Sequence, residues 1–191
     1  EPEVIEYRQH TLTCLACGTA TTPDWPADMP SGSFGPRVQA TVGYLTGRMG
    51  VSQRDVEEAM DALFHTDLAL GSVSAVEQSV SAALSQPVEE AHTYVQQQAV
   101  VNADETSWRQ GKQRLWLWIG TTPVVTVFLL ATRGAAGAQQ LLGRIFQGIV
   151  GSDRWSGYNW LPVLQRQLCW AHLKRDFQAF VDRGGGSGAC G

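Results

Sequence analysis

Two aspartates have the residue type and the surroundings best suited to chemistry in this chain. Asp104 ends an apolar run that begins at Val100, and Asp153 ends a second apolar run that begins at Gly148. Each pattern predicts a buried strand that carries a carboxylate to the edge of a sheet. Neighbouring carboxylates repel each other, and a hard divalent cation, Mg²⁺ or Mn²⁺, removes that repulsion. Such ions activate water or a 3′-hydroxyl for in-line phosphoryl transfer.

The elements predicted between the aspartates would bring them together. From residue 100 onward the sequence predicts strands at 100–104, 114–121 and 124–131, a helix at 135–146, strands at 148–153 and 166–169, and a helix at 170–180. A short connection joins the second and third strands into an antiparallel hairpin. The helical crossover lets the fourth strand lie parallel to the first and beside it. Asp104 and Asp153 are then neighbours, while Glu105 points away from the cation because adjacent strand side chains diverge.

The first half of the chain is predicted to be largely helical. Helices are predicted at 36–47, 52–64, 74–84 and 88–97, the last of them started by Pro87. Ser52 with Asp55, and Ser74 with Glu77, have the spacing of capping boxes. Two capped helices joined by a turn resemble a helix-turn-helix, whose second helix reads DNA. The second helix here contains no Lys or Arg, so structural packing or subunit contact is the alternative interpretation.

Cys14 and Cys17 have the spacing of one knuckle of a zinc ribbon, in which a tight turn points both sulfurs at one Zn²⁺. A complete site needs further ligands. His10 is the other nearby candidate, because Cys169 and Cys190 lie in a different part of the chain. A turn with two unmetallated thiols is therefore the alternative. A redox pair is disfavoured, since no thioredoxin-like strand and helix surround the two thiols.

Composition and charge narrow the class of partner. With 43% hydrophobic residues and seven Trp, the chain is expected to fold around a core. No apolar run reaches the roughly 18 residues of a membrane helix, and no signal pattern opens the chain, so we expect a cytoplasmic protein without a membrane partner. Residues 1–98 carry four Arg and no Lys against thirteen acids, whereas residues 99–191 carry ten Lys and Arg against five acids. A polyanion is therefore expected to bind the second half.

The spacing of the two aspartates alone fits a metal site and also fits ordinary strand ends or helix caps, but the surrounding motifs are more specific. They are, in order, Asp-Glu-Thr-Ser-Trp at 104–108, Leu-Trp-Leu-Trp at 115–118, Ser-Asp-Arg-Trp-Ser-Gly-Tyr at 152–158 and Cys-Trp-Ala-His-Leu-Lys-Arg-Asp-Phe at 169–177. Together they resemble the transposases of the insertion sequence 66 family over nearly the whole chain. The Cys14/Cys17 pair resembles the end of that family's N-terminal zinc-binding segment.

The resemblance implies an α+β fold, in which a zinc-ribbon remnant and a helical region precede a partial ribonuclease-H-like mixed sheet with flanking helices. The corresponding parts are residues 1–30, 31–98 and 99–183, followed by glycine-rich residues 184–191, which are predicted to be a flexible tail. The implied catalytic core is of the Asp-Asp-Glu type and acts on DNA ends with a divalent metal. Asp104 corresponds to its first carboxylate and Asp153 to its second.

Further residues take their expected roles from the same resemblance. Cys169 and His172 match a Cys-x-x-His signature that supports the active site in related transposases. His172 then orients a carboxylate or a phosphate; a role in capping or packing on the last helix is the alternative. Arg154, Lys174 and Arg175 are the expected contacts to DNA.

The resemblance also implies parts that this sequence lacks. The third acid, a glutamate on a later helix, is expected well beyond Asp176, and the other half of the zinc segment is expected before residue 1. We therefore expect an internal fragment, or a degenerate copy, of a bacterial, nucleoid-associated transposase that self-associates on transposon ends and target DNA. Little activity is expected from this chain alone. A non-enzymatic DNA-binding or assembly module and a metal-dependent nuclease are the alternative functions.

Overall fold

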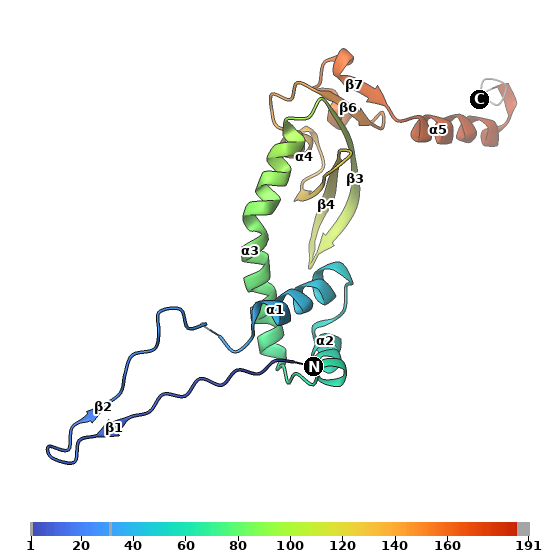
Figure 1. Ribbon diagram of the computed structural model, residues 1–191. Coiled ribbons are helices and arrows are strands. Elements are labelled where there is room, and N and C mark those ends of the chain that lie inside the picture. Colours follow the sequence, from blue (N-terminus) through green and yellow to red (C-terminus); the bar gives the residue numbers. More distant parts are fainter. Residues whose placement is uncertain (1, 31, 187–191) are drawn as a thin grey trace. The chain divides into compact units, whose positions relative to one another are not determined.

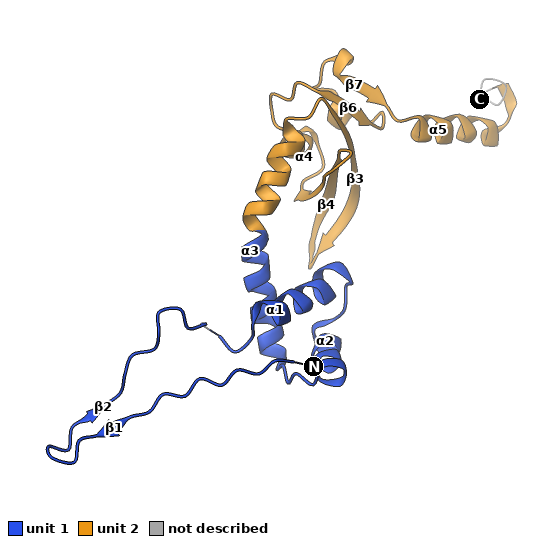
Figure 2. Cartoon of the chain, viewed as in Figure 1, with its two compact units in different colours: residues 1–84 blue, residues 85–191 orange. Residues whose placement is uncertain are grey.

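The computed structural model describes residues 2–30 and 32–186 (Figure 1). The chain divides into two compact units, residues 1–84 and residues 85–191 (Figure 2). Most of the predicted flexible tail, residues 184–191, lies outside the described residues. Among the described helices, none is long and apolar enough to cross a membrane.

Unit 1 begins with an extended segment that contains one short hairpin. Strand β1 (Leu12–Thr13) pairs antiparallel with β2 (Ala20–Thr21). Cys14 and Cys17 lie in the turn between these strands, and both side chains are exposed. The turn is closed by the backbone N–H of Gly18, which donates to the carbonyl of Cys14 at 2.8 Å. The hairpin therefore brings the two thiols into one exposed turn.

The rest of unit 1 is helical. Its elements are α1 (Pro36–Gly43), the π-helical η1 (Tyr44–Arg48), α2 (Gln53–Phe64) and the first part of α3 (Leu70–Gln96). Ser52 caps α2 by accepting the backbone N–H of Asp55 at 3.2 Å, which confirms the predicted helix start. The apolar faces of these helices form a core of Val42, Val56, Met60, Leu68, Val73 and Val76.

The prediction of two separate helices on either side of Pro87 is wrong. Helix α3 runs without a break through this proline. A proline removes its own backbone donor and crowds the preceding turn, so the helix continues only where packing outweighs that loss. Val73, near one end of α3, is buried in the core of unit 1, and Val95, near the other end, is buried in the core of unit 2. Ser74 consequently lies inside α3 and does not cap it.

Unit 2 is built on a five-stranded mixed sheet. Its strands are β3 (Val100–Gln110), β4 (Gln113–Thr121), β5 (Thr126–Ala131), β6 (Ile149–Ser152) and β7 (Arg166–Leu168), in the order β5-β4-β3-β6-β7. Strands β3, β4 and β5 pair antiparallel, whereas β6 pairs parallel with both β3 and β7. The predicted hairpin and the predicted crossover next to the first strand are both confirmed.

Strand β3 is longer than predicted. The expected strand ends at Asp104, but β3 continues to Gln110 because its antiparallel pairing with β4 extends from Asn102 to Gln110. Its parallel pairing with β6 covers only Val100 to Asn102. Asp104 therefore lies within β3, just beyond the point where β6 ceases to be its neighbour. The Asp104 side chain is exposed.

The two faces of the sheet differ in how they are covered. Helix α4 (Ala135–Leu142) packs on one face, over a core formed by Val95, Val101, Ala103, Trp118, Val127, Ala131, Ala138, Leu141, Leu142, Phe146, Val150, Tyr158 and Leu161. Asp104 lies on the opposite face, in one cross-strand row with Ile119 and Phe128. Phe128 is 61% exposed. Asp104 therefore projects from an accessible surface of the sheet.

The remaining elements of unit 2 are short or peripheral. They are the 3₁₀ turns η2 (Ser156–Tyr158) and η3 (Val163–Gln165) and the last helix, α5 (Trp170–Arg183). The turn η2 contacts α4 on the covered face, where Tyr158 is fully buried. Helix α5 starts directly after β7 and has no buried residue.

Replacement of Gly137 by alanine is expected to destabilise unit 2 by about 1–3 kcal/mol. A Cβ at this position would lie 2.6 Å from the Trp118 ring and 2.5 Å from the carbonyl oxygen of Thr132, so α4 would have to move away from the sheet. Gly71 in α3 provides the matched control, because a Cβ there would meet no atom within 4 Å. Gly71→Ala should be neutral or stabilising by up to about 1 kcal/mol. Urea unfolding followed by circular dichroism measures both; unchanged stability of Gly137→Ala would contradict the close packing of α4.

Candidate functional site

One cavity on the open face of the sheet collects four of the predicted site residues. Its volume is about 360 Å³, and its walls come from β3, β4, β6, β7 and the start of α5. The predicted site residues that line it are Asp104, Asp153, Cys169 and His172. The other lining residues are Asn102, Ala103, Ile119, Thr121, Gly151, Ser152, Gln167, Leu168 and Trp170. Carboxylate, thiol and imidazole groups therefore share one small space.

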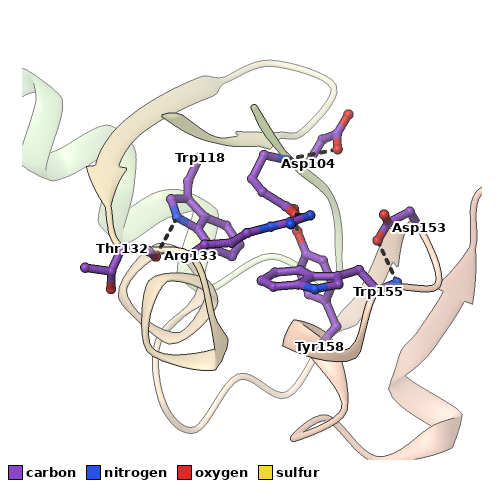
Figure 3. Close-up of polar contacts among 8 residues, drawn as sticks. Asp104, Trp118, Thr132, Arg133, Asp153, Trp155 and Tyr158 are labelled. Atoms are coloured by element: carbon purple, nitrogen blue, oxygen red, sulfur yellow. Dashed lines mark hydrogen bonds and ion pairs between the residues drawn. The ribbon is translucent and has the colours of Figure 1, made fainter. Parts of the chain in front are cut away.

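Strand register explains why the two aspartates line one cavity. Asn102 of β3 pairs with Gly151 of β6 as the last pair of their parallel ladder. Asp104 and Asp153 each follow two residues later, Asp104 within β3 and Asp153 directly after β6, so both lie at the same end of the ladder. Figure 3 shows both side chains at this edge of the sheet.

Each aspartate is held by a local hydrogen bond. The Oδ1 atom of Asp104 accepts the backbone N–H of Glu105 at 3.0 Å, and the Oδ1 atom of Asp153 accepts the backbone N–H of Trp155 at 2.9 Å. The backbone carbonyl of Asp153 also accepts from the Ser152 hydroxyl at 3.0 Å and from the Arg166 guanidinium at 3.3 Å. The segment that carries Asp153 is therefore anchored from its own strand and from β7.

The donor set suits a hard divalent cation. Oδ2 of Asp104 and Oδ2 of Asp153 receive no hydrogen bond from the described residues, and both carboxylates line the cavity. Mg²⁺ and Mn²⁺ prefer oxygen ligands, and Mg²⁺ is commonly bound by one or two carboxylates together with water. Within residues 2–30 and 32–186, no group of three or more His, Cys, Asp and Glu side chains could hold a metal. The fit therefore depends on two carboxylates and on water.

Cys169 and His172 form the wall contributed by the start of α5. Cys169 is the N-cap of this helix, and its backbone N–H donates to the carbonyl of Ser152 at 2.8 Å, directly before Asp153. The side chain of His172, with backbone N–H groups of the first turn, lowers the pKa of the Cys169 thiol. Nδ1 of His172 is buried and has no hydrogen-bond partner among the described residues. The Cys-x-x-His spacing thus places a thiol and an imidazole on one helical turn beside the aspartates.

Glu105 lies behind the cavity, as the prediction that it points away from the cation requires. Its side chain is 3% exposed, and it accepts hydrogen bonds from the Tyr158 hydroxyl at 3.2 Å and from the Arg133 guanidinium at 3.4 Å. Burial, and next the negative charge of Asp153, raise the pKa of the Glu105 carboxyl. Burial and the charge of Glu105 likewise raise the pKa of Tyr158.

An aromatic cluster surrounds this buried acid. The rings of Trp118, Trp155 and Tyr158 have centroids 6.0–6.1 Å apart. The guanidinium of Arg133 lies 4.5 Å from the centroid of the Trp155 ring, and Figure 3 shows these two side chains together. The same guanidinium lies 4.1 Å from the centroid of the Trp116 ring. The sequence alone does not predict that Glu105 contacts Arg133 and Tyr158. The aromatic residues two and five positions after Asp153 were the available signal, but nothing local pairs them with Arg133.

The predicted DNA contacts lie around α5. Arg154 follows Asp153 directly and forms an ion pair with Asp176 of α5 at 2.7 Å. Lys174 and Arg175 are exposed on the same helix. Two of the three cations are therefore on the surface of α5, and the third is engaged by a carboxylate of that helix.

One protein-family model covers most of the chain. A family model described as Transposase IS66 family matches residues 31–189. The matched segment contains the four predicted site residues that line the cavity, Asp104, Asp153, Cys169 and His172. It begins after the hairpin that holds Cys14 and Cys17. No curated protein and no solved structure gives a significant match.

Cys17 is expected to react as a thiolate near neutral pH. Its contacts with the Thr19 side chain and backbone lower its pKa to about 7, and its Sγ atom lies 3.3 Å from the Thr19 hydroxyl oxygen. Alkylation of Cys17 by iodoacetamide, followed by mass spectrometry, should therefore rise through an inflection near pH 7. In Thr19→Val the inflection should move upward, towards the ordinary thiol value. An inflection at the same pH in both proteins would contradict the role of Thr19.

Proposed function

The chain belongs to the IS66 family of transposases, and from this we propose that residues 99–183 form a ribonuclease-H-like catalytic core for cleavage and transfer of DNA strands. Membership of the family implies transposition as the process and DNA as the partner. The strand order β5-β4-β3-β6-β7, with three antiparallel strands followed by a helix and parallel strands, supports this fold. A metal-dependent nuclease would use the same site and would differ in releasing cut ends without joining them.

The observation that carries the proposal is the single cavity lined by Asp104 and Asp153. We propose that their carboxylates hold Mg²⁺ or Mn²⁺, which supplies charge neutralisation and an activated oxygen nucleophile at the scissile phosphate. The parallel pairing of β3 with β6 positions both acids before any cation arrives. Two carboxylates fix a cation less rigidly than three, so we expect the 191-residue chain to bind the ion but to cleave DNA poorly.

Cys169 and His172 take supporting parts in the proposal. The contact between the Cys169 N–H and the Ser152 carbonyl ties the start of α5 to the strand that leads to Asp153. The unpartnered Nδ1 atom of His172 is a hydrogen-bonding group for a carboxylate or a phosphate oxygen. We propose that this pair orients groups at the cavity and does not bind the divalent ion.

A zinc site at Cys14 and Cys17 remains a separate proposal. The two thiols share one exposed turn, and the lowered pKa of Cys17 favours the thiolate form that zinc binds. Two thiols make half of a tetrahedral site, so the remaining ligands must come from residues outside this turn.

Loss of either aspartate should weaken divalent-ion binding. Asp104→Asn and Asp153→Asn each remove a negatively charged oxygen ligand, and each is expected to weaken Mn²⁺ binding by more than about tenfold. Asp182→Asn is the matched control, because this exposed acid of α5 does not line the cavity. Titration with Mn²⁺, followed by electron paramagnetic resonance of the free ion, measures the dissociation constants.

Two results would contradict the assignment. Mn²⁺ binding that is unchanged in both aspartate variants would exclude them as ligands. Strong magnesium- or manganese-dependent nicking by the chain that survives Asp104→Ala would refute both the role of Asp104 and the expected low activity.

DNA binding independent of the cation is the second candidate function, and the basic second half of the chain favours it. If Lys174 and Arg175 contact phosphates, Lys174→Gln with Arg175→Gln should reduce the slope of log affinity against log salt by about 2. Arg48→Gln, an exposed change in the acidic half, is the control and should leave the slope unchanged. Fluorescence anisotropy with a labelled duplex measures the slope. An identical slope in the double variant would remove these two residues from the interface.

A further inference from the structure

Glu105 is a buried carboxylate that the proposed chemistry does not use. It lies on the face of β3 opposite to Asp104, and its side chain is 3% exposed. Burying a carboxylate opposes folding, and an apolar side chain of similar size would fill the same space without that cost. What the acid supplies, and an apolar residue cannot, is its pair of hydrogen-bond acceptors.

Both acceptors are used, and they join two separate segments of unit 2. Oε2 of Glu105 accepts the hydroxyl of Tyr158 in η2 at 3.2 Å. Oε1 accepts the guanidinium of Arg133, which follows β5, at 3.4 Å. Glu105 therefore connects the central strand of the sheet to the segment that follows Asp153 and to the segment that precedes α4.

A short series of contacts leads from these partners to Asp153. The Arg133 guanidinium, held by Glu105, lies over the Trp155 ring with 4.5 Å between the guanidinium carbon and the ring centroid. The Tyr158 ring meets the Trp155 ring edge-on at 6.0 Å. The backbone N–H of Trp155 then donates to Oδ1 of Asp153 at 2.9 Å (Figure 3). The residue that orients the Asp153 carboxylate is thus packed between the two partners of Glu105.

We propose that Glu105 is a positioning residue: by holding Tyr158 and Arg133 it fixes the segment 153–158 and thereby keeps the Asp153 carboxylate directed into the cavity. The proposal rests on the proposed function, since it assigns Asp153 to the cation site. The proposal gives the two adjacent acids of β3 different roles. Asp104 faces the cavity, whereas Glu105 positions the Asp153 carboxylate from the opposite side of the sheet.

The close packing of this segment makes it sensitive to its polar contacts. A Cβ at Gly157 would lie 2.1 Å from the Trp155 ring, so the backbone folds tightly beneath that side chain. Trp155 is only partly buried, whereas Tyr158 is fully buried. The Arg154–Asp176 ion pair and the hydrogen bonds to the Asp153 carbonyl hold the start of this segment. Glu105 holds its later part through Tyr158 and, by way of Arg133, the Trp155 ring.

The test compares the full chain with Glu105→Gln and Tyr158→Phe. Glutamine keeps one acceptor oxygen and loses the charge and the second acceptor, whereas phenylalanine removes only the hydroxyl that Glu105 accepts. The first readout is the exchange rate of the Trp155 backbone amide by ¹⁵N–¹H NMR, because that N–H donates to Asp153. Exchange should be about tenfold faster in Glu105→Gln and faster by a smaller factor in Tyr158→Phe. Glu89→Gln, an exposed acid of α3, is the control and should leave the rate unchanged.

The second readout is Mn²⁺ binding, which separates this proposal from the proposed function. If both hold, the Mn²⁺ dissociation constant rises about tenfold in Glu105→Gln. If the unmodified chain binds no Mn²⁺ while Trp155 exchange still accelerates in Glu105→Gln, the positioning role stands and the cation site fails. Unchanged Trp155 exchange in both folded variants overturns the positioning role, whatever the Mn²⁺ result. Should Glu105→Gln fail to fold, as judged by circular dichroism, Tyr158→Phe alone decides the outcome.

Discussion

The parallel pairing of β3 with β6 is the contact on which the candidate site depends. These strands are distant in sequence, and three backbone pairs, Val100 to Asn102 with Ile149 to Gly151, join them. Because the pairs end at the same level, Asp104 and Asp153 lie at the same end of the ladder, where both line one cavity. A shift of one residue in this register would turn one of the acids to the opposite face. The buried side chains of Val101 and Val150 oppose such a shift, since they belong to the core beneath α4.

The arrangement of charge around this pairing separates the acids by role. Residues 99–191 contain five acids. Two of them, Asp104 and Glu105, lie in β3, and a third, Asp153, directly follows the neighbouring strand β6. On the covered face, Glu105 is compensated by Arg133 and Tyr158. On the cavity side, each aspartate accepts one backbone N–H through Oδ1, and its Oδ2 receives no hydrogen bond from the described residues. The negative charge of Glu105 is therefore compensated on the covered face, whereas the charges of Asp104 and Asp153 remain available to a cation at the cavity.

The parts that could be predicted from sequence are those with local causes. Ser52 marks the start of α2 because its own side chain caps the helix. The spacing of the apolar residues, together with a helical crossover, indicates that β6 lies beside β3. What escaped prediction depends on distant contacts. Pro87 lies inside α3 because cores at both ends hold that helix, and β3 passes Asp104 because β4 continues to pair with it. The partners of Glu105 come from two other segments, so no spacing in the sequence could pair them.

The central claim is that Asp104 and Asp153 together form a divalent-cation site. The most direct measurement is a crystal of the chain grown with Mn²⁺, with anomalous diffraction data collected at the manganese absorption edge. If both aspartates bind the cation, an anomalous peak should lie in the cavity, within coordination distance of a carboxylate oxygen from each aspartate. A well-ordered sheet with no peak between the two aspartates, or with manganese bound only elsewhere, would contradict this claim.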